Sequence, residues 1–145
     1  MSDPAPPTPT LFFGSGPVAL PALSHLLRSG LVDIVTVVTV PARPAGRKGR
    51  LTPTPVAELA AQRGLPILTP RTLRDDAVQA ELRDIGADLI VLTDYGRLIP
   101  GAVLDLPRHD ALNIHPSLLP RHRGAPAVRS ACRSRSQWSG GQHGP

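Results

Sequence analysis

The chain has 145 residues, which at the usual size of protein domains allows one domain at most. Hydrophobic residues make up 41% of the chain and aromatic residues only 3%, so we expect a core of aliphatic side chains. The single cysteine excludes an internal disulfide, and no segment approaches the roughly 18 apolar residues that a membrane span needs. We therefore expect a cytoplasmic protein with no membrane partner.

The formal net charge of +5 is unevenly distributed along the chain. Residues 129–145 hold three arginines and no acidic residue, so they contribute +3. A second basic cluster without an acidic neighbour consists of Arg43, Arg47, Lys48 and Arg50. Such a cluster suits a nucleic-acid phosphate backbone, although a solvated loop with incidental charge is the simpler interpretation of composition alone.

The predicted elements alternate between strands and helices. Residues 1–9 are rich in proline, and we expect them to be disordered. Short apolar or β-branched runs predict strands at 10–13, 33–40, 65–68, 89–93 and 112–115. Helical spacing of apolar residues and end signals predict helices at 17–29, 54–63, 74–85 and 100–106. A long loop, residues 41–53, separates the second strand from the second helix.

This alternation predicts an α/β fold, a Rossmann-like parallel sheet with helices on both faces. In open sheets of this kind, ligands bind beyond the carboxyl ends of the strands. The predicted boundaries place the glycine-rich turn at 14–16, the basic loop, the segment 95–100 and Asn113 with His115 at that edge.

The segment Gly14-Ser15-Gly16-Pro17-Val18-Ala19 fits the dinucleotide-binding pattern G-x-G-x-x-[G/A] between a strand and a helix. That pattern also expects an acidic residue at the end of the second strand, where Val40 and Pro41 stand instead. A tight turn against the helix is therefore the favoured interpretation. A nucleotide-binding or tRNA-binding module without catalysis remains an alternative.

Asn113 and His115 are two residues apart on a predicted strand, so both side chains should leave the same face, with Leu112 and Ile114 filling the opposite face. An amide donor beside an imidazole suits stabilisation of an oxyanion and transfer of a proton near neutral pH. A satisfied structural pair would have the same spacing.

The run from Asn113 through Ser117-Leu118-Leu119-Pro120 to Arg123-Gly124 resembles the signature of the folate-dependent formyltransferases. The resemblance covers residues 10–128 and includes the stretches 12–15, 41–56, 64–67, 86–91, 95–100 and 103–107. Residues 129–145 lack any helical or strand period, so we expect an aberrant, disordered tail.

The resemblance implies transfer of a formyl group from 10-formyltetrahydrofolate to an amine, with Asn113 and His115 as catalytic residues and no metal. It also implies a folate slot whose lining residues are Arg97, Leu98, Ile99 and Val103, closed by Ser117, Leu118, Leu119, Pro120 and Gly124.

The basic loop resembles the tRNA-facing loop of the family branch that acts on initiator methionyl-tRNA, which gives Arg43, Arg47, Lys48 and Arg50 a role in tRNA binding. A small amine substrate, glycinamide ribonucleotide or an amino sugar, is the alternative. The family's catalytic aspartate, its later strands and its C-terminal barrel would lie beyond Pro145. We therefore expect a truncated, monomeric chain with impaired activity.

Overall fold

The computed structural model describes residues 5–114, so the predictions for His115, the 117–124 turn and the 129–145 tail lie outside the described residues. Five strands form one sheet in the order β5-β2-β1-β6-β7, and all four pairings are parallel. Their bounds are β1 (Thr8–Phe13), β2 (Val32–Val38), β5 (Ile67–Leu68), β6 (Leu89–Leu92) and β7 (Asp110–Asn113). The predicted parallel α/β sheet is confirmed.

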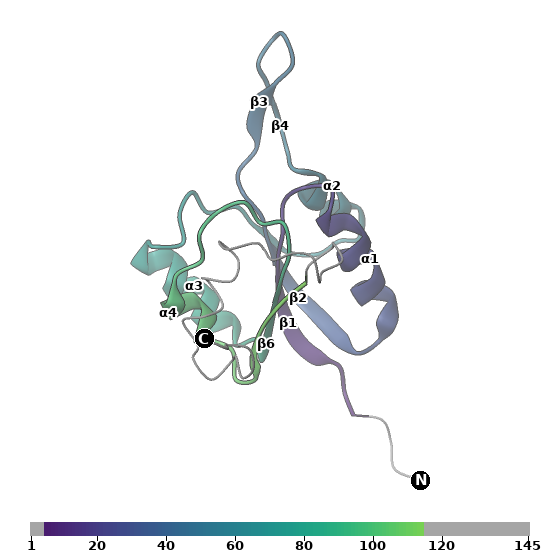
Figure 1. The fold of residues 1–145 in the computed structure, drawn as a ribbon, viewed down its shortest axis with the longest axis vertical. Helices are drawn as coiled ribbons and strands as arrows, with labels where there is room; N and C mark the ends of the chain where they lie inside the picture. The colour runs from purple at the N-terminus through teal and green to yellow at the C-terminus, as the bar shows by residue number, and fades with distance from the viewer. Residues whose placement is uncertain (1–4, 115–145) are drawn as a thin grey trace, which may run out of the picture.

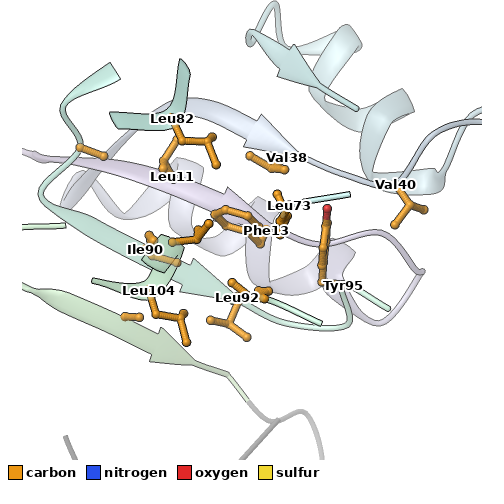
Figure 2. Packing of buried hydrophobic residues seen from close by; sticks show 14 residues of the cluster. Leu11, Phe13, Val38, Val40, Leu73, Leu82, Ile90, Leu92, Tyr95 and Leu104 are labelled. Carbon is orange, nitrogen blue, oxygen red and sulfur yellow. The ribbon is translucent and has the colours of Figure 1, made fainter. Parts of the chain in front are cut away.

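Helices cover both faces of this sheet (Figure 1). Two of them, α1 (Ala19–Ser29) and α2 (Pro55–Gln62), pack on one face through a core cluster that includes Phe12, Leu23 and Val56. On the other face lie α3 (Asp76–Ile85) and α4 (Gly101–Leu104). Their core cluster surrounds Phe13 and is drawn in Figure 2. Alternate residues of β1 thus enter opposite cores, as expected for a central strand.

The helix ends follow local sequence signals. Thr54 accepts a hydrogen bond from the backbone N–H of Ala57 at 3.0 Å, and Pro55 occupies the first turn of α2, as predicted. Gly30 ends α1 in the left-handed conformation with φ 73°. Helix α3 begins two residues later than predicted because Asp75 caps it. Ala77 lies in the first turn of α3 and is exposed.

The N-terminal boundary also differs from the prediction. Strand β1 begins at Thr8, whose backbone N–H donates to the carbonyl of Leu31 at 3.1 Å. Thr8 and Pro9 therefore belong to the sheet and not to a disordered N-terminal segment. The cause is pairing with β2, which a short strand can gain from its neighbour even where its own sequence is rich in proline and polar residues.

The predicted loop at 41–53 contains an antiparallel hairpin that projects from the body of the molecule (Figure 1). Its strands are β3 (Arg43–Ala45) and β4 (Arg50–Thr52). Gly46 and Gly49, with φ 77° and 61°, allow the chain to reverse between them. We call residues 43–52 the basic hairpin.

The last described strand differs from its prediction in position and burial. It spans residues 110–113 in place of 112–115, and Leu112 is 47% exposed rather than buried. Ile114 does pack against the α1–α2 core, as predicted. β7 is the edge strand of the described sheet, so only β6 flanks Leu112. Among the described helices, none has the length and apolar character to cross a membrane.

Candidate functional site at the carboxyl edge of the sheet

The strand register aligns the carboxyl ends of the central strands. Phe13 pairs with Val38 on one side and with Leu92 on the other, and Leu92 pairs with Asn113. The segments that follow these residues therefore emerge at one edge of the sheet. They are the glycine turn at 14–16, the base of the basic hairpin, the segment 93–100 and Asn113 itself. This confirms the predicted common edge for the described segments, while His115 lies outside them.

The strand order reverses between β1 and β6, and this reversal is the point where parallel sheets commonly bind ligands. Here the glycine turn after β1 is bonded directly to Asp94 after β6. The backbone N–H groups of Ser15 and Gly16 donate to the carbonyl oxygen of Asp94 at 2.9 and 3.2 Å. The Asp94 carboxylate also accepts from the N–H of Val18 at 3.2 Å, so it lies at the N-terminus of α1.

The close approach of Asp94 explains the need for glycine in this turn. A Cβ atom on Gly16 would lie 2.3 Å from Asp94 Oδ2, and one on Gly14 would lie 2.7 Å from the Phe12 ring. In a dinucleotide-binding domain the helix N-terminus receives a phosphate, but here a carboxylate of the chain itself fills that position. This geometry supports the tight-turn interpretation of the glycine motif over nucleotide binding.

The four basic residues lie on the basic hairpin in two groups. Arg43 pairs with Thr52 and Ala45 with Arg50, which places Arg43 and Arg50 on the same face of the hairpin. Arg47 and Lys48 occupy the tip between the two glycines. All four side chains are exposed, and within residues 5–114 none of them forms an ion pair. Their charge is therefore free for a ligand.

Asn113 is half-buried at the end of β7, on the face of the sheet where Ala111 enters the α3–α4 core. Its carboxamide forms no hydrogen bond to another residue between 5 and 114. A satisfied structural amide would have such a partner in the sheet, so the described contacts leave Asn113 available as a donor. Its predicted partner, His115, lies outside the described residues.

The segment after β6 contains a buried phenol beside the predicted folate slot. The Tyr95 ring packs edge-on against Phe13 with 5.5 Å between ring centroids (Figure 2). Burial raises the pKa of Tyr95 to about 12, while the nearby positive charge of Arg97 acts in the opposite direction. The Arg97 guanidinium donates to the carbonyl of Arg71, which ties this segment to the loop before α3.

The residues predicted for the folate slot divide into two kinds. Leu98 is 58% exposed, whereas Ile99 and Val103 are buried in the α3–α4 core. The backbone N–H groups of Arg97, Leu98 and Ile99 do not donate to any other backbone group in the described part of the chain. The 97–99 segment therefore offers a ligand one exposed apolar side chain and three backbone amides that have no backbone acceptor among the described residues. The slot residues 117–120 and 124 lie outside the described residues.

A groove of about 460 Å³ lies beside α1 and contains none of the predicted site residues. Its lining residues are Val18, Pro21, Ala22, His25, Leu26, Thr93 and Ile114. The Thr93 hydroxyl is buried and has no hydrogen-bond partner among residues 5–114. Sequence analysis missed this groove, although Val18, Ala22 and Leu26 form a second apolar stripe at helical spacing. Among residues 5–114, no three potential metal ligands lie close enough together to hold an ion.

These features define an α/β domain with a parallel sheet and a candidate ligand site at the carboxyl edge of that sheet. A family model described as "Formyl transferase" matches residues 10–141, and the chain belongs to this family. The match extends past Val128, where the motif comparison placed the end of the resemblance.

The curated relatives give a more specific similarity. The chain is 48% identical over 134 residues to a methionyl-tRNA formyltransferase of Stutzerimonas stutzeri, covering 92% of this chain and 42% of that protein. It is 46% identical over 125 residues to the same enzyme of Nitrobacter winogradskyi, covering 86% of this chain and 40% of the relative. The chain thus spans about two fifths of the length of these relatives.

Solved structures share the fold at lower identity. Glycinamide ribonucleotide transformylase 1 of Symbiobacterium toebii superposes with a TM-score of 0.59 and 26% identity, over 96% of this chain and 63% of that chain. The two groups of similar proteins act on different amines according to their names, so the choice between substrates depends on features of this chain.

Proposed function

We propose that this chain forms the N-terminal part of the catalytic domain of an enzyme that formylates the amino group of initiator methionyl-tRNA, with 10-formyltetrahydrofolate as the formyl donor. The observation that carries the proposal is the basic hairpin. The hairpin presents four positive charges from the same sheet edge as Asn113, and none of the four has an ion-pair partner within residues 5–114. The names of the curated relatives support the same substrate.

The chemistry needs a hydrogen-bond donor and a proton carrier. The amino nitrogen of the methionyl group attacks the formyl carbon, whose carbonyl oxygen becomes an oxyanion. The bond from that carbon to N10 of the folate then breaks, and the attacking amine loses a proton. In the proposal, the Asn113 carboxamide donates to the oxyanion, and the His115 imidazole takes up the proton of the amine and delivers it to N10, so that tetrahydrofolate leaves as a neutral amine. No covalent intermediate on the protein is required.

The described residues fit a folate co-substrate at the 97–99 segment. A flat pterin ring binds between apolar surfaces and presents hydrogen-bonding groups along its edge. The backbone amides of Arg97, Leu98 and Ile99 have no backbone acceptor within residues 5–114 and supply donors for that edge, and the exposed Leu98 side chain supplies an apolar contact. Ile99 and Val103 support this segment from the core, so their part in folate binding is indirect.

Glycinamide ribonucleotide is the second candidate substrate, because the similar solved structures include transformylases for it. Two observations disfavour it. The Asp94 carboxylate at the N-terminus of α1 would repel a phosphate at the anion site of the glycine turn. A small substrate also has no use for a basic hairpin that projects from the body.

A chimaera in which the C-terminal residues of the Stutzerimonas relative follow this chain tests the proposal. We expect it to formylate initiator methionyl-tRNA and to leave glycinamide ribonucleotide unmodified when both are supplied with 10-formyltetrahydrofolate. Preference for glycinamide ribonucleotide would overturn the proposed substrate. A monomeric state and a cytoplasmic location remain predictions of the sequence.

A further inference from the structure

The basic hairpin has few contacts that could fix its direction. Residues 42–53 are all exposed, and β3 and β4 pack mainly against each other. In Figure 1 the hairpin projects away from both helical layers. Its orientation relative to the substrate edge must therefore be set where its two ends join the body.

Two threonines join the ends of the hairpin. Thr39 precedes the hairpin and Thr54 follows it, and their hydroxyl oxygens are 2.7 Å apart. Thr39 is completely buried, so water cannot replace this contact easily. The backbone N–H of Thr39 also donates to the carbonyl of Leu68 at 3.0 Å, which anchors this end to β5.

The contact between the threonines belongs to a directed chain of hydrogen bonds. The Thr39 hydroxyl donates to the Ser15 hydroxyl at 3.3 Å, so its one hydrogen is used there and Thr54 must donate to Thr39. Thr54 in turn accepts from the N–H of Ala57 as the cap of α2. Ser15 accepts a second bond from the N–H of Val40 at 3.2 Å. The chain thus links α2, the hairpin base and the glycine turn.

We propose that Thr39 is a positioning residue that fixes the direction of the basic hairpin relative to the substrate edge of the sheet. This inference rests on the proposed function, because it treats the hairpin as the surface that binds tRNA. Thr39 touches no substrate. It acts through Thr54 and Ser15, and within residues 5–114 its hydroxyl is the one group that bonds to both side chains.

Replacement of Thr39 by valine keeps the branched shape and removes the hydroxyl. Ser15 and Thr54 then lose their shared partner, and the hairpin base loses its cross-link. The hairpin should sample more directions, so tRNA binding must restrict more motion and becomes weaker. The number of phosphates contacted stays the same, so the dependence of affinity on salt should keep its slope.

The experiment compares Thr39→Val and Thr39→Ser in the full chain, with Thr36→Val as the matched control. Thr36 is a buried threonine of β2, three positions before Thr39, and within residues 5–114 its hydroxyl bonds only to the neighbouring carbonyl of Val35. Heteronuclear NOE values of the Gly46 and Gly49 amides measure hairpin motion without any ligand. Titration with initiator methionyl-tRNA at several salt concentrations gives the affinity and its salt slope.

For Thr39→Val we expect lower NOE values at both glycines and an affinity for tRNA about 3- to 10-fold weaker, with the wild-type slope. Thr39→Ser should restore both properties, and Thr36→Val should match the wild type. Unchanged NOE values and affinity in Thr39→Val would overturn the inference.

If Thr39→Val does not fold, a second variant tests the same contact between the threonines. Thr54→Val breaks the same contact from the less buried side, and we expect the same loss of order at Gly46 and Gly49. Ordered glycine amides in Thr54→Val would also contradict the role of the threonine contact. If Thr39→Val loosens the hairpin but the chimaera described above binds no tRNA, the proposed function fails while the positioning role stands.

Discussion

Gly16 and Asp94 are in such close contact that a single added methyl group at Gly16 would lie 2.3 Å from the Asp94 carboxylate oxygen. The two residues belong to different crossovers of the fold, and the contact joins the glycine turn to the end of β6 at the point where strand order reverses. Asp94 adopts a positive φ of 52° to reach this position. The contact closes the place where a nucleotide phosphate would otherwise bind.

The first prediction follows from this contact. Gly16→Ala should destabilise the fold, because the Asp94 carboxylate must move away and lose its bond to Val18. In an Asp94→Ala background the same substitution should be much less harmful. Chemical denaturation of the four proteins gives the coupling, which we expect at about 1–3 kcal/mol. Additive effects of the two substitutions would show that the contact has no energetic role.

The second prediction concerns pH. Tyr95 has its pKa raised from 10 to about 12, so between these values the unfolded chain releases a proton that the folded chain keeps. The free energy of unfolding should therefore fall as pH rises from 10 to 12, by about 2–3 kcal/mol in total at most. Tyr95 is the single tyrosine, so absorbance of the phenolate reports its titration directly. Tyr95→Phe should remove this part of the pH dependence, and a folded-state pKa near 10 would contradict the prediction.

The third prediction separates the two kinds of residue in the folate slot. Leu98→Ala should weaken folate binding and leave stability almost unchanged, because the Leu98 side chain is mostly exposed. Val103→Ala should lower the free energy of unfolding by about 1–3 kcal/mol, since it leaves a void in the core. Fluorescence titration with a folate analogue and urea denaturation measure the two effects. Unchanged folate affinity in Leu98→Ala would show that the 97–99 segment is not part of the folate slot.

The fourth prediction concerns Asn113. In the chimaera that contains the relative's C-terminal residues, Asn113→Ala should lower kcat by about 10²- to 10³-fold, the usual loss when one oxyanion donor is removed. Binding of folate and of tRNA should change little, because the amide acts mainly on the transition state. A rise in KM without a change in kcat would assign Asn113 to substrate binding instead.

Local signals predicted the helices well. Thr54 caps α2 with its side-chain hydroxyl, and Pro55 and Gly30 act through their own backbone conformation, so the sequence around them was sufficient. The hairpin was predicted only as a loop, because its six strand residues are all exposed and show no apolar alternation. The hairpin is determined by two glycines with positive φ, and a pattern of hydrophobic residues gives no information on the conformation of a glycine.

Contacts between distant residues were beyond sequence reasoning. Asp94 and Val18 are separated by 76 positions, and only the strand order brings them together. The error at Leu112 has a similar origin, since the burial of a strand residue depends on which strand and helix lie beside it. The common edge was predictable because parallel strands all point the same way.

The most direct test is the salt dependence of tRNA binding to the chimaera with and without Arg47. Arg47 is exposed at the tip of the basic hairpin and has no ion-pair partner within residues 5–114. Arg83→Ala is the matched control, because Arg83 lies in the last turn of α3, away from the hairpin. We expect Arg47→Ala to weaken tRNA binding and to flatten the slope of log affinity against log salt by about 0.7–0.9 per lost phosphate contact, with folate binding unchanged. Intact tRNA affinity together with damaged folate binding in Arg47→Ala would place the hairpin in the folate pocket and contradict its role in tRNA recognition.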